Sequence, residues 1–549
     1  MTSRRDFVRT AAGASVALAG FPGIILRSRF AADVVIRNGT VFDGSGAAGR
    51  VLDVAVSADR ISAVARKIPG RGATEIDARG LAVAPGFIDI HSHGDGTLWS
   101  DPNAESVIRQ GVTTIVVGQD GSSRAPRATG GGREDEASRQ FATMAELWSA
   151  LPTVNPAVNV ASMIGLGTVR DVVIGGDDRP ATPDELTRMR GLVEAALRDG
   201  ACGASTGLEY TPGAFASRDE LIELCRPLKS RGLPYATHMR NEDDRLLEAI
   251  DEAIAVAHGA GCPLEISHLK AEGPRNWSKQ DEAFARIAAG RSAGTDIKFD
   301  CYPYVAFQTG LTNLFPVWSR DGSDAAFLAR LDDPSVAPRI RTESLEKVAL
   351  IGGWDNVMIS NVSNPADRAA EGARLGTYAA QHGMDPYDMA VALLKRNHAN
   401  VGMVGFAMSE DNVDKIYAHP LSMVCSDGGA FAVDGPAHVG HPHPRGLGTF
   451  PRVLARYVRE RKVLTLAQAI HKMTGMPAAR LHLRDRGRIA PNAAADVVVF
   501  DPATVQDTAT YANPFQYPIG ISAVVVNGAI ALRDGSRGAT RTGRPLPVA

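Results

Sequence analysis

The segment Gly86-Phe-Ile-Asp-Ile-His-Ser-His-Gly-Asp95 has the pattern of a short apolar strand that ends in two histidines. Side chains two residues apart in a strand point to the same side, so His91 and His93 are expected to face one small volume. Two imidazoles in this arrangement suit a divalent metal ion, although such a pair also occurs by chance or as a structural pair. The pattern therefore predicts a metal site that other parts of the chain must complete.

The composition excludes several classes of protein. The chain has 549 residues, of which 44% are hydrophobic, and its formal net charge is −2. This length suits one large barrel with a small additional domain. Proteins that bind nucleic acid or lipid surfaces show an excess of basic residues, so the charge argues against both classes. Five scattered cysteines without a Cys-x-x-Cys spacing argue against a disulfide framework and a zinc finger.

The N-terminus carries a pattern typical of export. The paired arginines Arg4 and Arg5 precede a weakly apolar stretch from Ala11 to Leu26. This resembles a twin-arginine signal, and the stretch is too short and too rich in Gly and Ala for a membrane-spanning helix. Residues 1–32 are therefore predicted to direct the protein to the periplasm without stable membrane insertion. The alternative is an ordinary basic N-terminus.

Short alternating apolar runs with Asn-Gly turns occur near both ends of the chain. Those between residues 33 and 82 have the same character as Ala495–Phe500 and Val524–Gly528. Such runs indicate short antiparallel strands. We predict that residues 33–82 and 485–549 build one small β-sandwich domain and that the catalytic body, 83–484, is inserted between them.

Within the catalytic body, strand and helix patterns alternate about eight times. Thr182-Pro-Asp-Glu185 is typical of the helix starts, with an N-cap, a first-turn proline and a capping glutamate. The repeated rhythm predicts a parallel (β/α)8 barrel of the TIM type. Residues 307–370 are too long for one strand–helix connection and are predicted to be an insertion after a late barrel strand. Strand-like runs at 357–359 and 401–406 leave the count open. The expected barrel strands are 83–90, 113–118, 159–165, 203–208, 235–238, 264–268, 297–302 and 423–426.

Polar side chains end several of these strands, where a barrel places its active site. Surface residues placed at random would not select strand ends so often. Four histidines and two carboxylates suffice to hold one or two divalent metal ions. The predicted metal ligands are His91, His93, Asp120, His238, His268 and Asp427.

Several motifs together resemble the N-acyl-D-amino-acid deacylase, or D-aminoacylase, branch of the amidohydrolase superfamily. The resemblance runs from about Asp33 to the C-terminal strands. The motifs are Gly86–Asp95, Tyr235-Ala-Thr-His-Met-Arg-Asn-Glu242, Ile266-Ser-His-Leu-Lys270, Tyr302-Pro-Tyr304, Ser426-Asp-Gly428, His443-Pro-Arg445, Thr449-Phe-Pro-Arg452 and Thr474-Gly-Met-Pro-Ala-Ala-Arg480.

The resemblance implies metal-dependent hydrolysis of the amide bond of an N-acyl-D-amino acid, which gives a carboxylate and a free amino acid. It implies that His238 and His268 hold the tighter metal ion, and that His91 and His93 hold or approach a second position. Asp427 would be the general acid/base that works with metal-activated water. The expected cofactor is Zn²⁺, as one or two ions, with other divalent metals left open.

Two positions depart from the family pattern. Asp120 stands where the family usually has a cysteine ligand, and a carboxylate can bridge two cations and forms a harder site than a thiolate. Alternatively, Asp120 caps the following loop and the site holds one metal ion. Leu166 stands where the family often has a histidine, which removes a possible hydrogen-bond donor to the reacting carbonyl group. This second departure leaves the substrate preference open.

The carboxylate of an acylated amino acid needs a cationic partner. Lys270 lies two residues after His268 and so points to the same side of the strand. The alternative for Lys270 is a buried ion pair with Glu209 or Glu242. The predicted substrate-binding residues are Lys270, Tyr210, Tyr304 and Arg445, of which Tyr210 follows from the resemblance.

Two further expectations concern the surroundings of the site. Residues 240–242 are expected to orient His238 as outer partners. No arginine occurs between residues 304 and 312, which favours substrates with neutral or apolar side chains over acidic ones.

Other functions compete with this prediction. A dipeptidase or cyclic-amide hydrolase would use the same metal site with a different pocket. An exported binding protein without catalysis is the third possibility, but retention of Asp427 argues against it, because pure binding needs no general base. The expected partner is a small amide, and the sequence gives no oligomeric state.

Overall fold

The computed structural model describes residues 32–127 and 139–548. Apart from Ala32, the predicted export signal lies outside these residues, and so does part of the loop after Asp120. In the part of the chain that the structure describes, none of the helices combines the length and the apolar character needed to cross a membrane.

Strands from both ends of the chain pair in one nine-stranded sheet. Its order is β21-β20-β19-β18-β5-β1-β2-β3, and β4 also pairs with β1. β18 runs antiparallel to β5, with Val499 opposite Val83, so the C-terminal strands join the N-terminal ones directly. The strands are β1 (Ala32–Val41), β2 (Arg50–Ser57), β3 (Arg60–Ala65), β4 (Gly72–Asp77), β5 (Ala82–Pro85), β18 (Val497–Phe500), β19 (Ile521–Val526), β20 (Ala529–Arg533) and β21 (Ser536–Arg537).

This sheet encloses its own apolar core. Ile61 of β3 and Ala523 of β19 belong to one buried cluster with Val34 of β1. Because β3 and β19 lie far apart in the strand order, the sheet must curl to bring their side chains together. The backbone N–H of Ile61 also donates to the carbonyl oxygen of Ala493, 2.9 Å away, which holds the edge strand β3 against the segment before β18.

Two parallel sheets form the centre of the molecule. One has the order β17-β13-β12-β11-β10-β9 and the other the order β6-β7-β8. Met163 alone separates β8 from β9. After β17, the backbone N–H of Asp427 donates to the carbonyl oxygen of His91, which follows β6, at 2.9 Å. The strands are β6 (Phe87–Asp89), β7 (Val112–Val117), β8 (Asn159–Ser162), β9 (Ile164–Gly165), β10 (Ala204–Gly207), β11 (Tyr235–His238), β12 (Leu264–Ile266), β13 (Ile297–Cys301) and β17 (Ser422–Val424).

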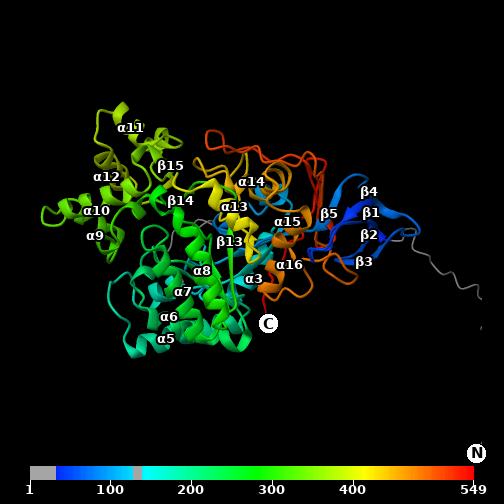
Figure 1. Cartoon of the computed structure of the whole chain (residues 1–549), viewed down its shortest axis with the longest axis horizontal. Helices are drawn as coiled ribbons and strands as arrows, with labels where there is room; N and C mark the ends of the chain where they lie inside the picture. The colour runs from blue at the N-terminus through cyan, green and yellow to red at the C-terminus, as the bar shows by residue number, and fades with distance from the viewer. Residues whose placement is uncertain (1–31, 128–138, 549) are drawn as a thin grey trace, which may run out of the picture.

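Helices connect the parallel strands. Thr182 caps the longest of them, α5, through the predicted capping box with Glu185. Figure 1 shows α5 to α8 packed along one side of the parallel strands. The connecting helices are α2 (Glu105–Arg109), α3 (Met144–Val154), α4 (Leu166–Val173), α5 (Pro183–Arg198), α6 (Arg218–Cys225), α7 (Leu246–Ala260), α8 (Gln280–Ser292) and α13 (Glu410–Ala418), and α14 (Arg445–Arg452), α15 (Leu466–Met473) and α16 (Gly475–Arg480) follow the last parallel strand.

The expected strand 83–90 is two strands that belong to different sheets. β5 pairs with β1 and β18, whereas β6 pairs with β7. The chain passes between the sheets at Gly86, where an added Cβ atom would lie only 2.2 Å from the Thr113 hydroxyl oxygen. A side chain larger than hydrogen does not fit there, so glycine allows the close approach.

The insertion is longer than the predicted range 307–370. β14 pairs antiparallel with β16, with Phe307 opposite Gly405, so the inserted unit closes only at residue 405. The runs at 357–359 and 401–406 belong to this three-stranded sheet and not to the parallel one. In Figure 1 its helices form a lobe at the end of the molecule opposite β1 to β5. Its elements are β14 (Phe307–Gly310), α9 (Asp324–Arg330), α10 (Ala337–Leu350), β15 (Val357–Val362), α11 (Leu375–Gln381), α12 (Pro386–Arg396) and β16 (Val401–Gly405).

Candidate metal centre

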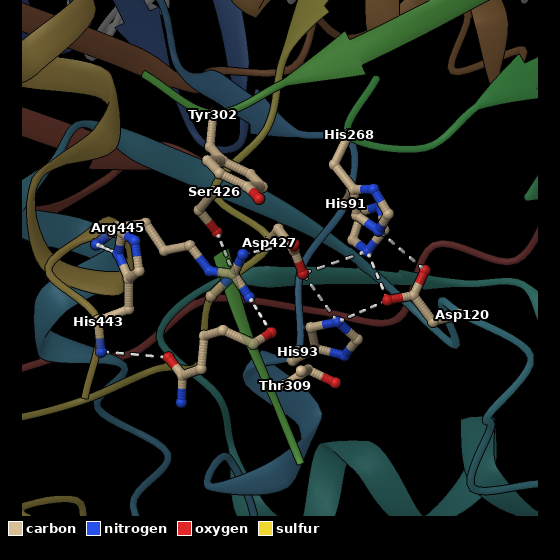
Figure 2. Close-up of polar contacts among 12 residues, drawn as sticks. His91, His93, Asp120, His268, Tyr302, Thr309, Ser426, Asp427, His443 and Arg445 are labelled. Atoms are coloured by element: carbon tan, nitrogen blue, oxygen red, sulfur yellow. Dashed lines mark hydrogen bonds and ion pairs between the residues drawn. The ribbon is translucent and has the colours of Figure 1, made fainter. Parts of the chain in front are cut away.

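All six predicted metal ligands meet at the carboxyl ends of the parallel strands, and Figure 2 shows five of them side by side. They form two groups, and within each group the possible ligand atoms lie within 4.8 Å of one another. Asp120 belongs to both groups. The first group is His91, His93, Asp120 and Asp427, and the second is Asp120, His238 and His268.

The first group surrounds a small space between two carboxylates. Nε2 of His93 lies 3.1 Å from Oδ1 of Asp427 and 3.4 Å from Oδ2 of Asp120. Nε2 of His91 lies 3.5 Å from the same two oxygen atoms. Ligand atoms about 2 Å from a zinc ion lie about 3–4 Å from one another, so this spacing fits a shared cation.

The second group uses the other oxygen of Asp120. Its Oδ1 atom lies 3.6 Å from Nε2 of His268, and that nitrogen lies 3.0 Å from Nδ1 of His238. Asp120 thus presents one oxygen to each group. A carboxylate placed in this way could be shared by two cations.

Several polar atoms of the centre are buried without a hydrogen-bond partner in the described residues. They are both ring nitrogens of His91, Nε2 of His238 and Oδ1 of Asp120. Buried polar groups are almost always paired, so open atoms in a cluster of imidazoles and carboxylates indicate a ligand from outside the described residues. Imidazole nitrogen and carboxylate oxygen together suit Zn²⁺ and its divalent neighbours, so the residues fit the predicted ion.

Three residues of the centre adopt left-handed backbone. The φ angles are +50° at Asp120, +36° at His268 and +48° at Asp427. Each residue follows a parallel strand, and the reversed φ turns the chain sharply out of the strand while its side chain stays at the strand end. At His268 the backbone N–H also donates to Oδ1 of Asp300, 2.7 Å away, which fixes the turn.

Arg445 controls the charge of Asp427. Its Nη1 atom lies 2.6 Å from Oδ2 of Asp427, and its guanidinium group lies 4.7 Å from the ring centre of Tyr302. Burial alone would raise the pKa of Asp427, but the charge of Arg445, followed by those of His268 and His91, holds that pKa well below its usual range. Asp427 is therefore a carboxylate, able to accept a proton.

Lys270 forms an ion pair with Glu242, one of the two alternative partners considered from the sequence. Its amino group lies 2.5 Å from Oε2 of Glu242, and the other oxygen of Glu242 lies 3.1 Å from Nδ1 of His268. Glu242 therefore orients His268, whereas its distance to Nε2 of His238 is 3.8 Å. Burial opposes the charge of Glu242, but Lys270 and the histidines lower its pKa to about 2.

The expectation that residues 240–242 orient His238 is wrong for the first two. Arg240 binds the carboxylate of Glu252, and the side chain of Asn241 accepts from the backbone N–H of Asp243. The spacing along the chain placed them beside His238, but after β11 Arg240 reaches Glu252 in the middle of α7 and Asn241 binds the backbone just before that helix. Tyr210 is closer, with its hydroxyl group 3.5 Å from Nδ1 of His238.

A cavity of about 1160 Å³ opens over the centre. Its wall includes the predicted substrate-binding residues Tyr210, Lys270 and Arg445, but not Tyr304. The Tyr304 hydroxyl group donates to the carbonyl oxygen of Pro444, 3.4 Å away, and its ring is 3% exposed. Tyr302 lines the cavity in its place.

Sequence reasoning missed Tyr302, although a signal for it was present. It directly follows β13, so the rule that located the histidines at strand ends applies to it as well. Pro303 then turns the chain, which carries Tyr304 away from the strand end.

Residues 74–310 and 357–532 match the family model described as the amidohydrolase family. The chain belongs to the amidohydrolase family. The stretch between the two matched ranges, residues 311–356, lies entirely within the inserted lobe. The predicted family is thus confirmed.

Characterised amidohydrolases are similar over almost the whole chain. The chain is 38% identical to an N-acyl-D-aspartate deacylase of Alcaligenes xylosoxydans xylosoxydans, covering 94% of this chain and 95% of that protein. It is 36% identical to a D-aminoacylase of the same organism, covering 94% and 97%. The crystal structure of an N-acyl-D-glutamate deacylase from Bordetella bronchiseptica, complexed with zinc and a phosphonate inhibitor, matches with a TM-score of 0.80 at 34% identity, covering 94% and 98%.

Leu166 does not face the reaction space of this amidohydrolase. It begins α4, is 2% exposed and packs in the main apolar core, whereas its neighbours Gly167 and Thr168 line the cavity. A donor to a reacting carbonyl group must therefore come from another residue.

Proposed function

We propose that this protein hydrolyses the amide bond of N-acyl-D-amino acids and releases a carboxylate and a free amino acid. The observation that carries the proposal is the cluster of imidazoles and carboxylates, with open buried atoms on His238 and Asp120, that lines one cavity together with Arg445 and Lys270. The deacylase activities named for its relatives support it. The proposed cofactor is Zn²⁺, as one or two ions, with another divalent metal as the substitute.

The ligand roles follow from the two groups of residues. His238, His268 and Asp120 are proposed to hold one ion, and His91, His93 and Asp427 a second, with Asp120 between them. A bound divalent ion supplies Lewis acidity, which polarises the amide carbonyl and lowers the pKa of water. Glu242 keeps the ring of His268 in the orientation that exposes Nε2.

Asp427 is the proposed general acid/base. Its Oδ1 atom faces the imidazoles, and its Oδ2 atom faces Arg445. As a carboxylate it accepts a proton from the attacking water at the metal side, and the same group then donates that proton to the leaving nitrogen. The amine leaves as a neutral group, which completes cleavage of the amide.

Arg445, Lys270 and Tyr302 are the proposed partners of the substrate carboxylate. The guanidinium of Arg445 is buried, and its Nε–H group has no hydrogen-bond partner in the described residues. A carboxylate in the cavity would satisfy that donor with a charge-assisted hydrogen bond. Lys270 contributes a second positive charge, 5.9 Å from the centre of the Tyr302 ring.

The charges of the cavity favour a substrate with a neutral side chain. The cations in its described lining are Arg127, Lys270 and Arg445, and each lies in an ion pair: with Asp171, Glu242 and Asp427 respectively. Once Arg445 and Lys270 engage the first substrate carboxylate, the cation that remains in the described lining is Arg127, which pairs with Asp171, so N-acyl-D-aspartate and N-acyl-D-glutamate should be poor substrates.

The size of the cavity favours a second candidate function, hydrolysis of dipeptides. Pockets that bury drug-sized ligands span about 300–1,000 Å³, and this cavity of about 1160 Å³ exceeds what an acetyl group and one amino acid occupy. An aminoacyl group in place of the acetyl group would fill more of it. Comparing acetyl and glycyl derivatives of one D-amino acid separates the two functions.

We also infer two architectural features and a location. The two parallel sheets are connected at Met163, between β8 and β9, and by the hydrogen bond from Asp427 to His91, which supports closure into a (β/α)8 barrel. The curl of the nine-stranded sheet supports a β-sandwich. The paired arginines Arg4 and Arg5 support export to the periplasm. Fractionation of cells that express the full chain, with Arg4→Lys and Arg5→Lys as the matched variant, tests export.

The function is tested with the purified, zinc-loaded protein and a panel of N-acetyl-D- and N-acetyl-L-amino acids. Release of acetate and free amine from D-leucine and D-methionine derivatives, with zinc measured by mass spectrometry, is the expected result. Activity on cyclic imides with none on the panel would contradict the proposal, as would full activity after complete removal of metal.

A further inference from the structure

His443 lies behind the cavity and not in its wall. Its side chain is fully buried, yet it precedes by two residues Arg445, which begins α14 and lines the cavity. Figure 2 shows its ring beside Arg445 and on the far side of that residue from Asp427. The residue has no direct access to substrate, so any influence on the reaction must pass through Arg445.

The hydrogen bonds of His443 determine which ring nitrogen carries the proton. The backbone N–H of Arg445 donates to Nδ1, at 2.9 Å, and an amide N–H can only donate. Nε2 lies 3.0 Å from the carbonyl oxygen of Ala306, which can only accept. Nδ1 is therefore an acceptor and Nε2 a donor, which makes the ring neutral. Burial, followed by the charge of Arg445, lowers the pKa of His443 well below its usual range, which agrees with this assignment.

Aromatic rings fix the imidazole from two sides. The ring centre of Tyr304 is 5.1 Å away at an interplanar angle of 89°, and that of Tyr511 is 5.0 Å away at 82°. These edge-to-face contacts are a stable arrangement of aromatic pairs. The backbone N–H of His443 also donates to Oε1 of Gln308, at 3.1 Å. Tyr304 thus packs against His443 instead of contacting substrate.

Arg445 is held from both ends by this arrangement. Its backbone is tied to the ring of His443, and its Nη2 group donates to the carbonyl oxygen of Gln308, at 3.3 Å. Gln308 belongs to the segment that follows β13, and the His443 ring contacts Ala306 of the same segment. The guanidinium is thereby aligned between Tyr302 and Asp427, and its Nε atom, which has no partner among the described residues, can donate to a ligand.

We propose that His443 is a positioning residue that sets Arg445 for recognition of the substrate carboxylate, a role that rests on the proposed function. The bond that matters is the one from the Arg445 N–H to Nδ1. Loss of this acceptor would let the first residue of α14 shift, and a displacement of about 1 Å at a binding group can cost roughly a hundredfold in rate.

Two substitutions separate the two bonds of the ring. In His443→Asn the amide oxygen takes the place of Nδ1 and still accepts from Arg445, whereas the bond to Ala306 is lost. In His443→Gln the terminal amide takes the place of Nε2 and still donates to Ala306, whereas Arg445 loses its acceptor. The proposal expects His443→Asn to behave much like the wild type and His443→Gln to bind carboxylate substrates poorly.

The measured quantity is a ratio, kcat/KM for N-acetyl-D-methionine divided by kcat/KM for its carboxamide, with acetate release as the readout. The carboxamide makes no ion pair with Arg445, and any inactive protein cancels in the ratio. We expect a roughly 10- to 100-fold lower ratio in His443→Gln, carried by KM, and a ratio within about twofold of wild type in His443→Asn. Gln308→Ala, which leaves the imidazole in place, should lower the ratio less and serves if the His443 variants do not fold.

Three results would overturn the inference: an unchanged ratio in His443→Gln, an equal fall in both His443 variants, or, if neither folds, an unchanged ratio in Gln308→Ala. Failure of the wild type to release acetate from either compound would instead contradict the proposed function, so the two failures are distinguishable.

Discussion

The two ends of the parallel strands both bury charged residues, but they do so in opposite ways. At the amino ends, Arg480 of α16 binds Oε2 of Glu265, at 3.0 Å, and Asp296, at 2.9 Å. Lys472 of α15 donates to the oxygens of His419 and Ser422. At the carboxyl ends, His91, His238 and Asp120 leave four buried nitrogen and oxygen atoms without a hydrogen-bond partner in the described residues, whereas Glu265 at the amino ends leaves one, Oε1.

Within one set of strands, the charged groups that stabilise the fold are thus at one end and the groups that can bind a ligand are at the other. Cations at the amino ends find their partners inside the chain, so those groups contribute to folding. The carboxyl ends offer several donor atoms to a ligand that the chain does not supply, in agreement with the rule that ligands bind there in parallel α/β sheets. Substitutions at the two ends should therefore change different measurable quantities.

The largest expected effect is at the carboxyl ends. Asp427→Asn removes the proposed proton acceptor while retaining the shape of the side chain, so kcat should fall by about 10³-fold or more. Metal content, measured on the same samples, separates lost catalysis from lost metal. Asp411→Asn, at an exposed position on α13, is the matched control and should leave kcat unchanged. A metal-replete Asp427→Asn protein with normal turnover would refute the assignment.

The next largest effect is at the amino ends and on stability alone. Arg480→Met leaves Glu265 buried without its cation, which should lower the free energy of unfolding by about 3–5 kcal/mol. Burial raises the pKa of Glu265 to about 8 even beside Arg480, so the loss is expected in full only above that pH, where this carboxyl group is charged in the wild type. Denaturant unfolding measures the loss, and kcat of the folded variant should match the wild type. Adding Glu265→Gln to Arg480→Met should restore much of the stability; no recovery would show that the charge is not the cause.

A smaller effect is expected behind the metal centre. Glu242→Gln retains an oxygen for His268 but loses the negative charge that pairs with Lys270, so metal affinity should fall about 10- to 100-fold. Competition with a chromophoric chelator measures this without any assay of activity. Glu248→Gln, an exposed position on α7, provides the control. Equal affinity in the two variants would mean that Glu242 does not tune the ligand.

The smallest effect concerns the pH dependence of stability. Burial, and then the charge of Lys298, lowers the pKa of Lys472 from its ordinary 10.5 to about 8. Between these values the unfolded chain binds more protons than the folded one, so stability rises with pH. This contribution should amount to about 1 kcal/mol between pH 8 and pH 9. It should vanish in Lys472→Met, as measured by urea unfolding at both pH values; an identical pH slope in the two proteins would contradict it.

The sequence predicted what depends on local patterns. We located His91, Asp120 and Asp427 because each is a polar residue close behind an apolar strand pattern. Such a pattern can be recognised from neighbouring residues alone. The helix start at Thr182 is equally local.

Pairings between distant segments could not be predicted in the same way. The lobe ends at Gly405 because β16 pairs with β14, and no pattern within 307–370 reveals a partner almost a hundred residues away. Likewise Glu242 is four residues from His238 in sequence, but the fold brings the ring of His268 closer to it. The position of the Tyr304 side chain depends on the turn at Pro303 and on packing against His443, which lies far away in the sequence.

The left-handed backbone at Asp120, His268 and Asp427 has a consequence for protein engineering. An L-residue in this conformation costs about 1–2 kcal/mol, so a selection for heat resistance alone would enrich glycine at these three places and discard the ligands. More heat-stable variants of the enzyme should instead be made at left-handed residues far from the metal centre. Ala58 and Lys462, whose φ angles are +50° and +55°, are two such positions. Glycine at these two positions would remove the same backbone strain without lowering kcat.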